Sequence, residues 1–179
     1  MWRALALLVL LLVPAAVAAD ARPRVVALST DFVLSGKFEL LAELATDAEV
    51  DFTHRQIETV SASELETALD GAALVLLDAP RGIDAVRLRQ AVGQALSERS
   101  LPWLQISGGG HRAEGLSAEQ AQRIADYYAH GGRRNFERMF AYLAASLRGQ
   151  PVDHIEPPAS LPEVGIYHPR YPERVFDNV

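Results

Sequence analysis

The chain has 179 residues, of which 49% are hydrophobic and 22% charged, with a formal net charge of -6. This composition excludes an intrinsically disordered chain and predicts a mildly acidic globular protein. All but one of the 17 basic residues are arginines scattered singly or in short pairs, so no basic stripe indicates nucleic-acid binding, and the lack of cysteine excludes disulfides and thiolate chemistry.

The first 19 residues have the pattern of a secretory signal peptide. A positive charge at Arg3 precedes an apolar run over residues 4–13, and an A-x-A pattern ends at Ala18. The run is shorter than the roughly 20 apolar residues that span a bilayer. We therefore predict a signal peptide over 1–19, a mature chain from about Asp20, a periplasmic location and no membrane segment after cleavage. An uncleaved anchor is the alternative.

Strand and helix patterns then alternate up to residue 107. Apolar and β-branched runs predict strands at 24–30, 50–57, 73–80 and 102–107, and the spacing of apolar residues predicts a helix at 35–47. Overlapping capping boxes at Ser61 and Ser63 predict a second helix that ends at Gly71, and a third helix is expected at about 83–98. This alternation implies right-handed parallel crossovers, so we predict an α/β fold, a flavodoxin-like or Rossmann-like three-layer sandwich with a parallel sheet. The expected strand order is 2-1-3-4, with a switch point between the first and third strands.

The carboxyl ends of these strands carry the candidate ligand-binding residues. Strands that flank a switch point open a crevice at their carboxyl ends, where loop N–H groups and carboxylates orient ligands. The candidates are Ser29, Asp31, Asp78, Ser107, Gly109 and His111. The plain alternative is that the two aspartates cap loops or helices and that the glycine run merely permits a tight turn.

Motifs for local catalysis are missing from the sequence. The glycine run at 108–110 lacks the lysine and hydroxyl residue of a phosphate loop, and it does not continue as G-x-G-x-x-G. The five histidines include no i, i+4 pair, and G-x-S-x-G does not occur. We therefore predict no catalytic residue and no local metal site, and we leave open whether the chain is an enzyme.

A helix pair over 117–148 is predicted next, completing an α/β domain over 20–149. A capping box at Ser117 starts its first helix, and we expect Gly131 to end that helix as a left-handed C-cap. The second helix is expected to start at about Asn135, whose side chain can cap it, and to carry an apolar stripe from Phe136 to Leu147.

Four prolines within residues 150–162 predict an extended linker. A new strand pattern comes after it at 163–169, so residues 163–179 are expected to begin a further domain that is truncated at Val179.

Two short segments in this order resemble one family. The segment YYAHGGRRNFERMFAYL, with the proline-rich stretch and GIYHP after it, resembles the large subunit of cobaltochelatase (CobN type) and the related magnesium chelatase H subunit. The matching residues are Tyr127, Tyr128, Gly131, Gly132, Asn135, Tyr142 and Leu143, and then Gly165, Ile166, Tyr167, His168 and Pro169.

This resemblance implies cobalt or magnesium chelatase (ligase) activity in tetrapyrrole and cobalamin biosynthesis, with a tetrapyrrole and a divalent metal as ligands and ATP used by partner subunits. In the family the insertion site lies in later regions, so this chain is expected to be an N-terminal fragment of an exported CobN-like large subunit that handles a tetrapyrrole or metal. Its partners would be the remaining domains of a longer chain.

Two other functions remain open on the sequence. One is a receiver-like signalling module, because Asp31, Asp78 and Ser107 lie at the ends of strands one, three and four. The other is an exported binding or scaffold domain without catalysis, which docks partners through the apolar stripe of the last helix.

Overall fold

The structure, a computed structural model, describes residues 22–33, 35–160, 166–167 and 175–176. The predicted signal peptide and most of the predicted further domain lie outside these residues. Within the described part, no helix is both long and apolar enough to cross a membrane.

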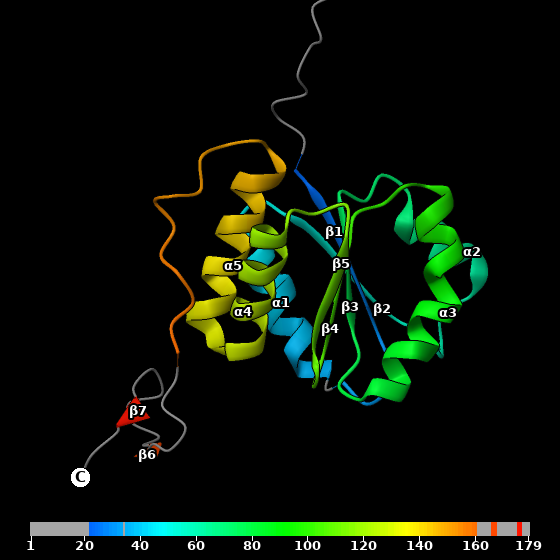
Figure 1. The fold of residues 1–179 in the computed structure, drawn as a ribbon, viewed down its shortest axis with the longest axis horizontal. Coiled ribbons are helices and arrows are strands. Elements are labelled where there is room, and N and C mark those ends of the chain that lie inside the picture. Colours follow the sequence, from blue (N-terminus) through cyan, green and yellow to red (C-terminus); the bar gives the residue numbers. More distant parts are fainter. Residues whose placement is uncertain (1–21, 34, 161–165, 168–174, 177–179) are drawn as a thin grey trace, which may run out of the picture.

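A five-stranded sheet forms the centre of the described chain (Figure 1). Its strands are β1 (Arg24–Ser29), β2 (Asp51–Gln56), β3 (Leu74–Asp78), β4 (Trp103–Ser107) and β5 (Gly110–Glu114). Their order is β2-β1-β3-β4-β5; β1 to β4 are parallel and β5 is antiparallel to β4. The predicted α/β three-layer class and the order 2-1-3-4 are confirmed.

Helices cover both faces of the sheet (Figure 1). They are α1 (Ser35–Asp47), α2 (Ala62–Leu69), α3 (Gly82–Glu98), α4 (Ala118–His130) and α5 (Gly132–Leu147). Side chains alternate across a strand, so Val25 and Ala27 of β1 pack in the core under α1, α4 and α5, while Val26 and Leu28 pack under α2 and α3. β3 is buried throughout, as its continuous apolar run predicts.

The fifth strand was not predicted. Its sequence, GHRAE, has no apolar alternation, because the strand lies at the sheet edge and four of its five residues are exposed. The glycine run, which in the plain alternative permits a tight turn, is the turn of a hairpin from β4 into β5.

The junction between α4 and α5 differs from the prediction in two ways. Gly131 has φ 60° and ψ -162°, which is a positive-φ conformation but not the left-handed helical one. Helix α5 begins at Gly132, three residues earlier than expected, and Asn135 lies buried within it instead of capping it.

The apolar stripe of α5 belongs to the core. Phe136, Met139, Phe140 and Leu143 are at most 5% exposed and pack in the same cluster as α1 and α4. The stripe is therefore not a free docking surface, and this part of the scaffold prediction is wrong.

Residues 150–160, which we call the strap, run along the helix pair without helix or strand of their own. Ile155 of the strap is buried in the core, and its carbonyl accepts a hydrogen bond from Arg123. Beyond the strap, β6 (Ile166–Tyr167) and β7 (Val175–Phe176) pair with each other in antiparallel fashion.

Candidate functional site

Two of the predicted site residues lie side by side at the carboxyl edge of the sheet. Ser29 ends β1 and Asp78 ends β3, and they are register partners in the parallel pair. Both are buried, at 0% and 7% exposure, on the sheet face that α1 and α4 cover. This position is the switch point that the strand order predicts.

The Asp78 carboxylate joins the sheet to two helices. Its Oδ2 atom accepts hydrogen bonds from Lys37 Nζ of α1 at 2.9 Å and from the Tyr128 hydroxyl of α4 at 2.6 Å. The Lys37 ammonium also lies 3.8 Å from the centre of the Tyr128 ring. A carboxylate taken out of water is stable only when it is paired and hydrogen-bonded in this way.

Burial shapes the chemistry of Tyr128. It raises the pKa of the Tyr128 hydroxyl well above the ordinary value of 10.0, and the neighbouring Asp78 charge raises it further. Tyr128 therefore stays protonated and serves as a hydrogen-bond donor to Asp78 at neutral pH.

A second polar pair lies beside this group. The Ser29 hydroxyl is 2.8 Å from Nε2 of His54, and the Phe38 ring stacks on the imidazole at 3.6 Å between centroids. Burial lowers the pKa of His54, the Arg55 charge lowers it further, and Asp78 opposes both. The imidazole is thus neutral at pH 7. Because Ser29 has no exposed surface, this pair is not an accessible nucleophile in this structure.

The other predicted site residues lie at the same end of the sheet but in different surroundings. Asp31 is exposed in the turn after β1, and His111 lies on the edge strand opposite Ile106. Ser107 donates to the carbonyl of Gly110 across the hairpin turn at 3.3 Å, and Gly109 is exposed in that turn. In the described part of the chain, no side-chain hydrogen bond or ion pair joins these four residues to Asp78.

Gly108 shows why the hairpin turn needs a glycine. Its N–H donates to the Pro80 carbonyl at 3.2 Å, and a Cβ at this position would lie 2.9 Å from the same oxygen. The backbone of the turn thus packs directly on the loop after β3, which any side chain at position 108 would prevent.

An arginine lies near Asp31 at the outer rim. Arg81 binds Asp84 through two hydrogen bonds of 2.5 and 2.9 Å, and its guanidinium lies 3.5 Å from the centre of the exposed Phe32 ring. Asp84 itself is fully buried. Next to Asp31, the surface therefore carries the exposed Phe32 ring and the Arg81 guanidinium, which Asp84 holds in place.

Sequence reasoning missed three members of the site: Lys37, His54 and Tyr128. Each reaches Ser29 or Asp78 from another element, so no local motif contains them. Two signals were available. Lys37 is the single lysine and lies in the first turn of the helix after β1, and Tyr128 lies on the buried face of its helix. Among the described residues, no group of three or more His, Cys, Asp or Glu could hold a metal ion.

Comparisons with known proteins agree with the resemblance found in the sequence. Residues 125–179 match the family model CobN/Magnesium Chelatase. The aerobic cobaltochelatase subunit CobN of Pseudomonas aeruginosa is 31% identical over 120 residues, which cover 64% of this chain and 10% of that protein. The chain is thus similar to the CobN family, and the match to the family model lies in residues 125–179.

A solved structure supports the fold of this chain. The catalytic subunit of cobaltochelatase from Mycobacterium tuberculosis aligns with 82% of the chain and 12% of its own length, with a TM-score of 0.56 and 21% identity. At this identity the likeness concerns the fold alone. The chain thus spans about a tenth of the length of the relatives it matches.

The residues that carried the family resemblance have separate structural tasks. Tyr128 donates inward to Asp78, whereas the hydroxyl of its neighbour Tyr127 donates to the carbonyl of Glu156 in the strap. Asn135 makes two hydrogen bonds to the backbone of Ala159. Its side-chain Nδ2 donates to the Ala159 carbonyl, and its Oδ1 accepts from the Ala159 N–H, both at 2.9 Å. The CobN-type segment therefore ties the switch point, the helix pair and the strap together.

Proposed function

We propose that this chain is the N-terminal portion of an exported CobN-type chelatase large subunit and takes part there in handling a tetrapyrrole or a metal during metal insertion. One observation carries the proposal: three residues of the helix pair, all within the segment that matches the family, bind the strap or Asp78. The strap is bound by Tyr127 and Asn135, and Asp78 is bound by Tyr128.

This arrangement favours a positioning role for the α/β domain. The strap is bonded along α4 and α5 by Tyr127, Asn135 and also Arg138, which contacts the Pro157 carbonyl and the Glu156 carboxylate. The end of the strap at residue 160 is therefore held in a fixed place on the domain. In the proposal, metal and ring are substrates, and the later regions of the large subunit carry out the insertion.

Ring handling by this portion can be tested directly. The full chain is titrated with protoporphyrin IX and, separately, with the corrinoid cobinamide, and the visible absorption spectrum is recorded. We expect a saturable spectral shift with one of the two rings. The lack of any saturable shift with both would contradict ring handling and favour a scaffold domain without catalysis.

Export is the second part of the proposal, and it rests on the pattern of residues 1–19. The test is a fusion of the full chain to alkaline phosphatase, which is active only outside the bacterial cytoplasm. The matched control starts at Asp20. We expect activity from the full chain and none from the control; equal activity of the two fusions would contradict export by this leader.

A receiver-like signalling module is the second candidate, and one contact favours it: Lys37 meets Asp78 at the end of β3. Against it, the Asp78 carboxylate is nearly buried, and Lys37 and Tyr128 both occupy its Oδ2 atom. Incubation with acetyl phosphate separates the two functions. Under our proposal Asp78 stays unlabelled, whereas labelling that Asp78→Asn abolishes would establish the receiver-like function.

A further inference from the structure

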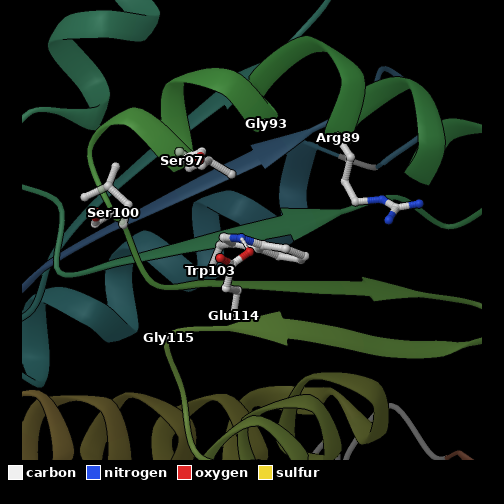
Figure 2. A pocket seen from close by; sticks show the side chains of 9 residues that line it. Arg89, Gly93, Ser97, Ser100, Trp103, Glu114 and Gly115 are labelled. Atoms are coloured by element: carbon white, nitrogen blue, oxygen red, sulfur yellow. Dashed lines mark hydrogen bonds between the residues drawn. The ribbon is translucent and has the colours of Figure 1, made fainter.

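A cavity of about 490 Å³ lies away from the switch point, between the second half of α3 and the edge of the sheet (Figure 2). It exists because β5 extends the sheet beyond the cover of α3: α3 packs on β3 and β4, and α4 packs on β5 from the other face. Its volume lies within the range of small-molecule sites.

The floor of the cavity is the indole ring of Trp103. Trp103 begins β4 opposite Glu114 of β5, and its Nε1–H donates to the Glu114 carboxylate at 3.2 Å. This bond fixes the orientation of the ring, and the part-buried side chain presents one face to the cavity (Figure 2). A fixed, partly open indole is a stacking surface for another flat ring.

The roof of the cavity is the turn of α3 at Gly93 (Figure 2). Glycine is unfavourable inside a helix compared with alanine. Close packing does not explain it here, because a Cβ at Gly93 would meet no atom within 4 Å. The missing side chain leaves a slot between the helix and the Trp103 ring.

Charged and hydroxyl groups lie at the two ends of this slot. Figure 2 shows Arg89 at one end and Ser97 and Ser100 at the other. Within the described residues, the Arg89 side chain makes one long hydrogen bond, of 3.5 Å from Nε to the Ala85 carbonyl, and no ion pair. Its guanidinium can therefore bind a planar anion in a two-point arrangement.

We propose that this slot binds a flat aromatic ring that carries a carboxylate. The ring stacks on Trp103 beneath Gly93, and the carboxylate pairs with Arg89. Glu114 fixes the indole from the strand side, which leaves the Arg89 end as the place for the negative group. This site is separate from Asp78 and does not depend on the chelatase proposal.

The test uses the full chain with Trp2→Phe, so that Trp103 gives the single indole N–H signal in a proton–nitrogen NMR spectrum. The probe is 2-naphthoate. We expect its titration to shift the Trp103 signal in a saturable way. Neutral 2-naphthamide and the non-aromatic cyclohexanecarboxylate should bind at least about tenfold more weakly, since each lacks one of the two contacts.

Three variants locate the site. Gly93→Leu fills the slot while favouring the helix, so its thermal unfolding should not be impaired although naphthoate binding is lost. Arg89→Gln should weaken naphthoate binding about tenfold, and Arg87→Gln, an exposed residue of the same helix, should leave it unchanged. Naphthoate binding by a folded Gly93→Leu chain, or equal affinity for naphthoate and naphthamide, would overturn the proposal.

Discussion

Asp78 is the residue through which β3, α1 and α4 meet. Its buried carboxylate has two donors, Lys37 and Tyr128, on the same oxygen. Removing one donor leaves the charge less well compensated, and a lost hydrogen bond to a buried charged group costs about 1.5–3 kcal/mol. The hydroxyl of Tyr128 is therefore expected to matter for stability.

We predict that Tyr128→Phe lowers the free energy of unfolding by about 1.5–3 kcal/mol, measured by urea denaturation at pH 7. The matched control is Tyr142→Phe. Tyr142 is equally buried in the core, but its hydroxyl makes no hydrogen bond within the described residues, so its loss should cost less than about 0.5 kcal/mol. If both variants lower the free energy of unfolding equally, the hydrogen bond from Tyr128 to Asp78 contributes nothing to stability.

The lowered pKa of His54 is expected to make the stability of the domain fall as the pH falls. Burial is the main cause that lowers the pKa of His54 in the folded chain, whereas the unfolded chain takes up the proton near 6.5. The unfolded state therefore binds more protons just below pH 6.5, and the stability present above that pH is lost as the pH falls through the folded pKa.

We predict that the urea midpoint falls between pH 7 and pH 5 and that His54→Gln reduces this fall, while the exposed His154→Gln leaves it unchanged. The measurement is a urea titration at half-unit pH steps. If the urea midpoint of the His54→Gln chain falls with pH as steeply as that of the parent, groups other than His54 cause the pH dependence.

At the scale of elements, the short link between α4 and α5 depends on one backbone conformation. Gly131, with φ 60° and ψ -162°, lies in a region that is essentially limited to glycine. A Cβ there would make only ordinary contacts, at 3.8 Å to Phe136 and 3.9 Å to the Tyr128 carbonyl. The cost of a substitution should thus come from the backbone and not from a steric clash.

We predict that Gly131→Ala destabilises the chain by about 1–3 kcal/mol in thermal or urea unfolding. Gly93→Ala is the opposite control, because Gly93 lies inside α3 with open space around it and should stabilise the chain by up to about 1 kcal/mol. A Gly131→Ala chain as stable as the parent would mean that alanine can adopt the junction's conformation.

Periodicity identified the buried elements of this fold well and the exposed ones poorly. β3 and the helix over 35–47 were predicted because packing on the core imposes a hydrophobic pattern on their sequences. β5 has no such pattern, since backbone hydrogen bonds to β4 hold it at the edge while its side chains face water. Its glycine turn was visible in the sequence, but the strand beyond it was not.

The same limit applies to the site. Ser29 and Asp78 were found because strand order places strand ends together. Their partners Lys37, His54 and Tyr128 arrive through tertiary packing, which one sequence does not display. The family motif was identified from its residue types and their spacing. Only the structure shows that the hydroxyl groups of Tyr127 and Tyr128 bind different residues, the first in the strap and the second at the sheet edge.

At the scale of the whole molecule, the strap decides how the α/β domain is joined to the chain beyond residue 160. A proline-rich segment in solution is an extended spacer with a range of directions. Here Ile155 is buried in the core. The carbonyls of the strap accept hydrogen bonds from Tyr127, Asn135 and Arg138 of the helix pair. The strap is thus part of the folded domain, and the direction of the chain at its end is set by α4 and α5.

Asn135 offers the sharpest test of this attachment, because its side chain closes a two-bond pair with Ala159 while it is 2% exposed. We predict that Asn135→Ala increases amide hydrogen exchange at Ala159 at least about tenfold, since loss of both bonds removes more than about 1.4 kcal/mol of local protection. Exchange in the centre of β3 should change much less, because the sheet core opens only on global unfolding. The exposed Gln122→Ala on α4 is the control. Unchanged protection at Ala159 would mean that the buried Ile155, and not the CobN-type asparagine, holds the strap in place.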